Sequence, residues 1–191
     1  LLEAPLLAFV LAFVLKMYHG GIYVFNLNEN LPSYMFMSVV VALFVGLTVS
    51  AEEIFKDRKI LKREKFLDLS RWSYLNSKIA VLFILSAIQM LMFAVVGNFV
   101  LEIHGMTTSY WIVLFSTCCF ANMLGLNIST AFNSAVTIYI LIPILLIPQL
   151  LLSGVIVKFD KLTPALASEK EVPLVGNMMA SRWAFEALAT H

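Results

Sequence analysis

The chain has 191 residues, of which 61% are hydrophobic and only 13% are charged, and its formal net charge is +1. Soluble globular domains are about 45–50% apolar and about 25% charged, so this composition predicts an integral membrane protein and excludes an ordinary soluble domain. The chain has no acidic tail and no nucleic-acid signature.

Five apolar stretches follow one another, each close to the roughly 20 residues that cross a bilayer as a helix. They predict membrane spans at residues 1–18, 34–51, 79–101, 110–128 and 135–157. The fold class is therefore an all-α, polytopic membrane protein with a single transmembrane domain. Because the chain begins without methionine inside an apolar run, and five spans put its ends on opposite sides of the membrane, we expect it to be a fragment that lacks a sixth span.

The positive charge is concentrated in residues 52–78, between the second and third predicted spans. This segment holds eight of the chain's thirteen lysines and arginines, namely Lys56, Arg58, Lys59, Lys62, Arg63, Lys65, Arg71 and Lys78. Because Lys and Arg resist translocation, a short basic loop between two spans stays in the cytoplasm. We therefore predict that residues 52–78 are cytoplasmic and that residues 158–191 are extracytoplasmic.

The basic segment also carries large apolar side chains, including Phe66 and Trp72. A solvated loop would not carry them without a surface to cover, and that surface is either a cytoplasmic partner protein or the lipid headgroup boundary. The pattern predicts a helix, a break near residues 68–70, and a second helix that Asp68 or Ser70 caps.

Small residues recur at every fourth position of the fourth span. Small side chains on one helix face allow close helix packing, either within the chain or at a subunit interface, and the sequence leaves both open. The residues are Thr117, Ala121, Gly125 and Ser129. Polar amides in apolar surroundings must also avoid lipid, so they form interhelical hydrogen bonds or line a substrate path. They are Asn122, Asn127, Asn133 and Gln149.

The fifth span contains Pro143 and Pro148. Each proline removes a backbone donor and crowds a preceding carbonyl, so a kink or a broken helix is predicted there. Near the end of the chain, residues 181–188 predict a short amphipathic helix at the outer membrane interface.

No motif in the chain predicts a catalytic or metal site. There is no phosphate-binding glycine loop and no H-E-x-x-H motif, and the adjacent Cys118 and Cys119 fit two buried small hydrophobic residues. The three histidines have no spacing that fixes a metal site. No acidic or basic side chain lies near the middle of a span, which argues against proton relays in the bilayer. We therefore predict no cofactor, metal or catalytic residue in this chain.

Three runs resemble a known family. The run Glu-Ile-Phe-Lys-Asp-Arg-Lys-Ile-Leu-Lys-Arg-Glu and the later Ser-Arg-Trp-Ser-Tyr-Leu-Asn-Ser-Lys resemble the first cytoplasmic loop of ABC exporter permeases of the type-2 class, above all the G-type (white-like) subfamily and its bacterial relatives. The run Ser-Arg-Trp-Ala-Phe-Glu-Ala-Leu at 181–188 is similar to the family's outer segment, and Gly154 has a counterpart after the fifth span. Residues 1–50 match by span order only.

The resemblance implies a six-span permease in the inner or cytoplasmic membrane, which dimerises with a second permease copy. Its ATPase partner, fused or separate, would bind ATP and Mg, and its substrate would be amphipathic or lipid-like. Residues that would couple to the ATPase are Arg58, Lys62, Arg63, Glu64, Phe66, Tyr74 and Lys78. The alternative is a non-transport membrane anchoring or assembly module that recruits a cytoplasmic partner through its basic loop.

Overall fold

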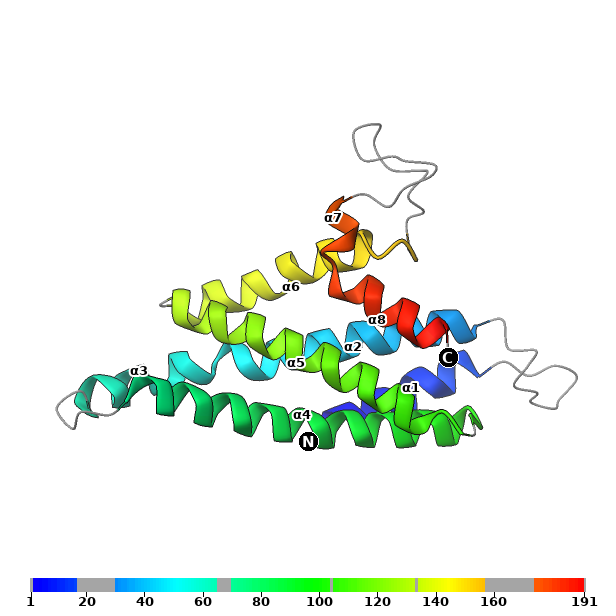
Figure 1. The fold of residues 1–191 in the computed structure, drawn as a ribbon, viewed down its shortest axis with the longest axis horizontal. Coiled ribbons are helices and arrows are strands. Elements are labelled where there is room, and N and C mark those ends of the chain that lie inside the picture. The colour runs from blue at the N-terminus through cyan, green and yellow to red at the C-terminus, as the bar shows by residue number, and fades with distance from the viewer. Residues whose placement is uncertain are drawn as a thin grey trace, which may run out of the picture.

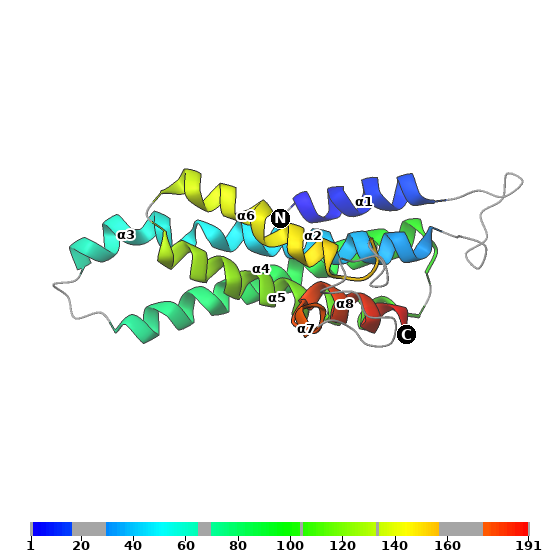
Figure 2. The same ribbon diagram turned by 90° about the horizontal axis from the view of Figure 1, so that it is seen from above.

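The computed structural model describes residues 2–16, 30–64, 70–103, 105–132, 134–156 and 174–190. Within these ranges the regular secondary structure is helical. The helices are α1 (Glu3–Leu15), α2 (Leu31–Ala51), α3 (Glu53–Glu64), α4 (Arg71–Val100), α5 (Thr107–Ala131), α6 (Ala135–Leu151), α7 (Leu174–Asn177) and α8 (Ala180–Ala189). The long helices run alongside one another in an elongated bundle, with α3 at one end (Figures 1 and 2).

Three helices of the described residues are long and apolar enough to cross a membrane, and they span Leu31–Asp57, Trp72–Val100 and Thr107–Ala131. The helices α1 and α6 are also apolar but have only 13 and 17 residues. At 1.5 Å per residue, α1 extends about 20 Å, which is less than the roughly 30 Å of a bilayer's hydrocarbon core. The expected all-α, multi-pass membrane fold is therefore found, while the number of five spans stays a prediction.

The helices α2 and α5 pack against each other most closely, because each contributes a glycine to the contact. A methyl group at Gly46 of α2 would lie 2.7 Å from the carbonyl oxygen of Cys118 and from the Cβ of Ala121. A methyl group at Gly125 of α5 would overlap the hydroxyl of Ser50. Small residues therefore bring the two backbones into contact, as is typical of helices that associate in a membrane.

The helix α4 is longer than the third span predicted at 79–101. It begins at Arg71, so residues 71–78 are the first two turns of the same unbroken helix. Ser70, directly before α4, has extended and not helical backbone, as expected for a break near residues 68–70. Ser70 occupies the position before the helix, but its side chain makes no capping hydrogen bond, and Asp68 lies outside the described residues. Of the two predicted caps, Ser70 is therefore excluded, and Asp68 stays a prediction.

At the other end of the chain, α6 runs unbroken through Pro143 and Pro148 and ends at Leu151. Of the predicted kink or break, the break therefore does not occur, and the kink stays a prediction. The predicted short helix near the C-terminus is present as α8. It packs against α2 and α5 in the half of the bundle away from α3 (Figure 1). The rings of Phe36 and Phe185 meet edge to face with centroids 6.0 Å apart, which holds α8 against α2.

Candidate functional site

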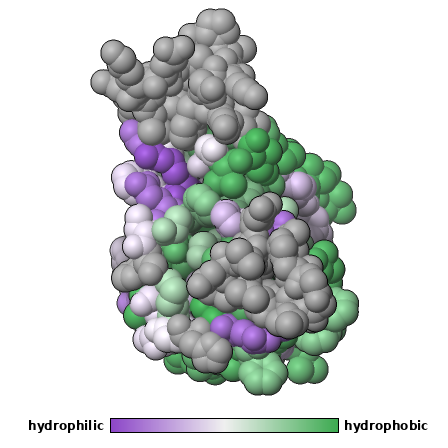
Figure 3. Space-filling model, turned by 90° about the vertical axis from the view of Figure 1, so that its right-hand side faces the viewer, coloured by the Kyte–Doolittle hydropathy of each residue, from purple (hydrophilic) through white to green (hydrophobic). Residues whose placement is uncertain are grey.

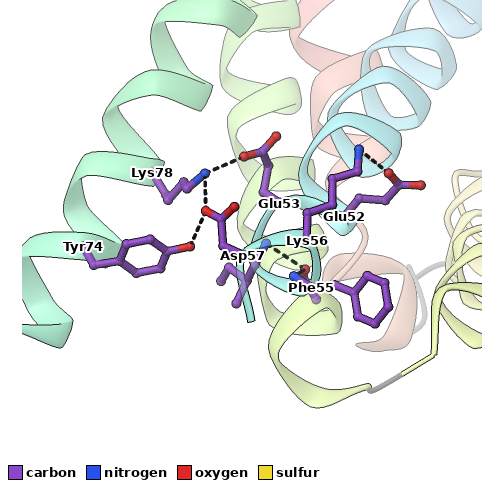
Figure 4. A network of polar contacts seen from close by, with 9 residues as sticks. Glu52, Glu53, Phe55, Lys56, Asp57, Tyr74 and Lys78 are labelled. Atoms are coloured by element: carbon purple, nitrogen blue, oxygen red, sulfur yellow. Dashed lines mark hydrogen bonds and ion pairs between the residues drawn. The ribbon is translucent and has the colours of Figure 1, made fainter. Parts of the chain in front are cut away.

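The basic segment 52–78 folds into α3 and the first turns of α4, and acidic and basic side chains join the two helices (Figure 4). The Lys78 Nζ of α4 lies 2.9 Å from the Glu53 Oε2 and 2.8 Å from the Asp57 Oδ2 of α3. The Tyr74 hydroxyl donates a hydrogen bond of 2.9 Å to the same Asp57 oxygen. We call these four residues the α3–α4 clasp.

The clasp follows from helical spacing on both sides. Residues four apart lie on one helix face, so Glu53 and Asp57 point from α3 in the same direction, and Tyr74 and Lys78 do so from α4. The single ammonium of Lys78 therefore reaches two carboxylates, and the Tyr74 hydroxyl supplies a further donor to one of them. The arrangement needs both helices to be formed and correctly placed.

Solvent access separates the clasp from an ordinary surface ion pair. The side chains of Lys78, Glu53 and Asp57 are only 23%, 34% and 27% exposed to solvent. Their charges are therefore partly shielded from water. The neighbouring Glu52–Lys56 pair, which the sequence predicts at i,i+4, is present, but Lys56 is 64% exposed. Exposed pairs contribute roughly 0–1 kcal/mol. The Glu52–Lys56 pair joins residues one helical turn apart, whereas the clasp joins two helices.

A second attachment holds the start of α3. The buried hydroxyl of Ser129, on α5, accepts hydrogen bonds from the backbone N–H groups of Ile54 at 3.1 Å and Phe55 at 2.9 Å. The first N–H groups of a helix have no partner within that helix, so a side chain from another helix satisfies them here. We call this contact the Ser129 cap, and it ties α3 to the end of α5.

The residues predicted to couple to an ATPase divide into two groups. Tyr74 and Lys78 point toward α3 and take part in the clasp. The others are on or after α3: Arg58, Lys62, Arg63 and Glu64 have helical backbone, their side chains lie outside what the structure describes, and Phe66 lies outside the described residues. Their contact with a partner stays a prediction.

Four residues of this site were absent from the sequence-based set. Glu53 and Asp57 could have been found, because they are acidic residues four positions apart. Tyr74 and Lys78 in the following helix have the same spacing. Ile54 and Phe55 offer only backbone to the Ser129 cap, and no side-chain pattern could have identified them. The acidic spacing was therefore the available signal.

The small-residue face of α5 lies inside the chain. Thr117, Ala121, Gly125 and Ser129 are all buried. Gly125 faces α2, where an added methyl group would lie 3.1 Å from the carbonyl oxygen of Leu47, and Ser129 faces α3. This face makes intrachain contacts, while the role of a subunit interface stays a proposal.

The predicted polar positions have different surroundings. Asn122 is 1% exposed, and its amide donates a 2.7 Å hydrogen bond to the Ser86 hydroxyl of α4. Asn127 is exposed and donates to a carbonyl of its own helix. The side-chain oxygen of Gln149 accepts from the backbone N–H of Ser181 at 3.2 Å, which attaches α6 to the first turn of α8. Asn133 lies outside the described residues.

Comparison of the amino-acid sequence with known proteins assigns the chain to a family. Residues 3–169 match the family model of the ABC-2 type transporter membrane domain. No curated protein and no solved structure gives a significant match. Membrane domains of this family normally work with an ABC ATPase, and the resemblance seen in the basic segment is thereby confirmed at the level of the family. With its apolar helices, the chain belongs to the ABC-2 type transporter family and is the membrane-spanning permease part of an ABC transporter.

Proposed function

We propose that this permease domain forms half of the substrate path of an ATP-driven exporter in the cell membrane, and that α3 receives the movement of a cytoplasmic ATPase domain. A second permease copy would complete the path, and the substrate would be amphipathic or lipid-like. The likeness of residues 52–78 and 181–188 to the G-type (white-like) subfamily supports this choice within the family.

The observation that carries the proposal is the double attachment of α3. The Ser129 cap ties its first turn to α5, and the clasp ties Glu53 and Asp57 to α4. The helix α2 precedes α3 with only Glu52 between them. A force applied to α3 would therefore move α2, α4 and α5 together, whereas a helix connected only through its chain would swing without moving the bundle.

The experiment compares two lysine variants in the full-length protein, reconstituted in liposomes with its ATPase. Lys78→Met removes the cation of the clasp, and Lys56→Met removes a lysine from the same segment whose ion pair stays within one turn. We expect Lys78→Met to lower the movement of a fluorescent phospholipid probe per ATP hydrolysed at least about fivefold, with unchanged insertion. Lys56→Met should behave as the wild type.

A Lys78→Met protein with the wild-type ratio of transport to hydrolysis would contradict the transmission role of the clasp. The charge reversal Arg63→Glu, in the same assay, tests the predicted contact of α3 with the ATPase, and we expect it to reduce ATP hydrolysis. If neither Lys78→Met nor Arg63→Glu changes ATP hydrolysis or transport, the alternative function is favoured. In that function the chain is an anchoring module that recruits a cytoplasmic partner through residues 52–78.

A further inference from the structure

The exposed face of α5 differs in chemistry from the exposed faces of the helices beside it. In the bundle, α5 runs between α4 on one side and α6 and α8 on the other (Figure 1). Between residues 80 and 99, every exposed side chain of α4 is apolar. The exposed side chains of α6 are apolar as well, apart from the hydroxyl of Tyr139. Lipid tails offer no hydrogen-bond partners, so these faces of α4 and α6 are suited to contact with lipid.

The exposed side of α5 mixes polar and apolar side chains, in what we call the α5 stripe. Its members recur every three or four positions, which places them on one side of the helix, and half of them carry a hydroxyl or an amide. They are Thr108, Ile112, Ser116, Phe120, Met123 and Asn127. At 1.5 Å per residue the stripe rises about 29 Å, which is close to the roughly 30 Å thickness of the hydrocarbon core.

The polar groups of the α5 stripe are accessible to a ligand. The Ser116 hydroxyl donates to the Val113 carbonyl at 2.9 Å, and the Asn127 side-chain nitrogen donates to the Met123 carbonyl at 2.8 Å. Each bond uses one hydrogen, so the side-chain oxygens of these two exposed residues remain available as acceptors. Lipid tails would leave the Asn127 amide oxygen without a partner. The α5 stripe is therefore suited to water or a polar ligand and not to lipid.

A hollow lies between α8 and the half of α5 that is away from α3. Its volume is about 320 Å³, which is within the range of small-molecule sites. Phe120 and Trp183 give the hollow two aromatic walls, and Ser116 contributes its accessible hydroxyl. The other residues of α8 that line it are alanines, which leave the space open. Among the residues that the structure describes, no charged side chain lines the hollow.

The two flanks of the molecule also differ at this end. Figure 3 looks at the end of the bundle away from α3, where one flank is hydrophobic and the opposite flank carries hydrophilic and intermediate residues. This asymmetry agrees with the difference between α5 and its neighbours, because a bundle that borders a water-filled path contacts lipid on one side only.

We infer that the α5 stripe and the hollow beside α8 form one wall of a water-filled substrate path, and that this wall takes an amphipathic substrate without net charge. The inference rests on the exporter function proposed above and adds the place of the path. The apolar part of the substrate lies against Phe120 and Trp183, and its hydroxyl or amide hydrogens donate to Ser116 or Asn127. A charged group that enters the hollow would lose part of its hydration without gaining an ion pair.

The first test measures which positions are in contact with water. Ser116→Cys and Asn127→Cys are each introduced into the full-length protein with Cys119→Ala, reconstituted in liposomes with its ATPase, and the Cys119→Ala protein alone is the blank. Ile84→Cys, at a 63% exposed position of α4, is the matched control. A thiol reacts as its thiolate, which apolar surroundings disfavour, so a water-soluble methanethiosulfonate on both sides of the membrane should label the two α5 positions at least about tenfold faster.

The second test measures the class of ligand by protection. Monooleoylglycerol has hydroxyl donors and no charge, and it should slow the labelling of Ser116→Cys. At an equal mole fraction in the bilayer, oleyl sulfate, an anion with a chain of the same length, should not slow it. Protection by both compounds or by neither would overturn the preference for uncharged substrates.

Labelling of both α5 positions as slowly as Ile84→Cys would overturn the place of the path. ATP-driven transport by the same preparations separates this result from a failure of the proposed function. If transport persists while the α5 positions are not labelled, the protein is an exporter whose path lies elsewhere.

Discussion

At the scale of single residues, the contact between α2 and α5 depends on the absence of side chains. Gly46 lies against Cys118 and Ala121, and Gly125 lies against Leu47 and Ser50. Two backbones at this distance gain van der Waals contact. In a bilayer this contact is a main source of helix association, because lipid tails are as apolar as the side chains and the hydrophobic effect does not drive helices together. Any larger residue at either glycine must push the helices apart.

Gly125→Leu should therefore destabilise the bundle. An added Cβ already overlaps the Ser50 hydroxyl and lies 3.1 Å from the Ala51 backbone nitrogen, and overpacking of this kind costs about 1–3 kcal/mol or more. The measurement is thermal unfolding in detergent. Ser116→Leu, at a less buried position of the same helix, serves as the control and should leave the midpoint unchanged. An unaltered midpoint for Gly125→Leu would show that this contact is not tight.

At the scale of elements, α3 is a short polar helix that other helices hold in place. Its apolar content is low, so propensity and burial alone give it little stability, and isolated helices of about 12 residues are marginal in water. The Ser129 cap satisfies two of its first N–H groups, and the clasp fixes the face that carries Glu53 and Asp57. Its order therefore depends on α4 and α5.

Ser129→Ala should loosen the first turns of α3. Loss of a capping hydroxyl costs about 1 kcal/mol, which corresponds to an increase of roughly fivefold in local opening. Hydrogen–deuterium exchange of the peptide that contains residues 53–64 would measure it. Ser116→Ala is the control on the same helix, because the Ser116 hydroxyl donates to the Val113 carbonyl of α5 itself. Equal exchange in the two variants would contradict a capping role for Ser129.

At the scale of the whole molecule, charge divides the two ends of the bundle. Residues 52–78, at the end with α3, include eight of the thirteen lysines and arginines. The opposite end carries the Lys16–Glu102 pair and a cavity beside it. By the positive-inside rule, we expect the α3 end to face the cytoplasm and the opposite end to lie at the outer face of the membrane.

This orientation predicts which cysteine substitutions a membrane-impermeant maleimide labels. Ile60→Cys, at a 54% exposed position of α3, should be labelled in inside-out vesicles and protected in intact cells. Glu102→Cys should show the opposite pattern. The native Cys118 is fully buried and should react in neither preparation. Labelling of Ile60→Cys in intact cells would reverse the orientation.

The apolar stretches of the chain are sufficient to predict its helical membrane fold. A chain in lipid must satisfy its backbone hydrogen bonds internally, so long uncharged runs become helices whatever their neighbours are. The position of the basic segment between two such runs, and its likeness to type-2 permeases, are equally local properties. Because these properties are local, the sequence alone predicts the family. It also identifies Tyr74 and Lys78 as candidate coupling residues.

The partners of those two residues follow from the way the helices pack. Lys78 and Glu53 are 25 positions apart, and the angle between α3 and α4 sets whether they meet. Ser129 has the spacing of a packing residue, but the place where α5 ends makes its hydroxyl the cap of α3. The sequence determines the chemistry of each side chain, whereas the distance between two side chains on different helices depends on tertiary packing.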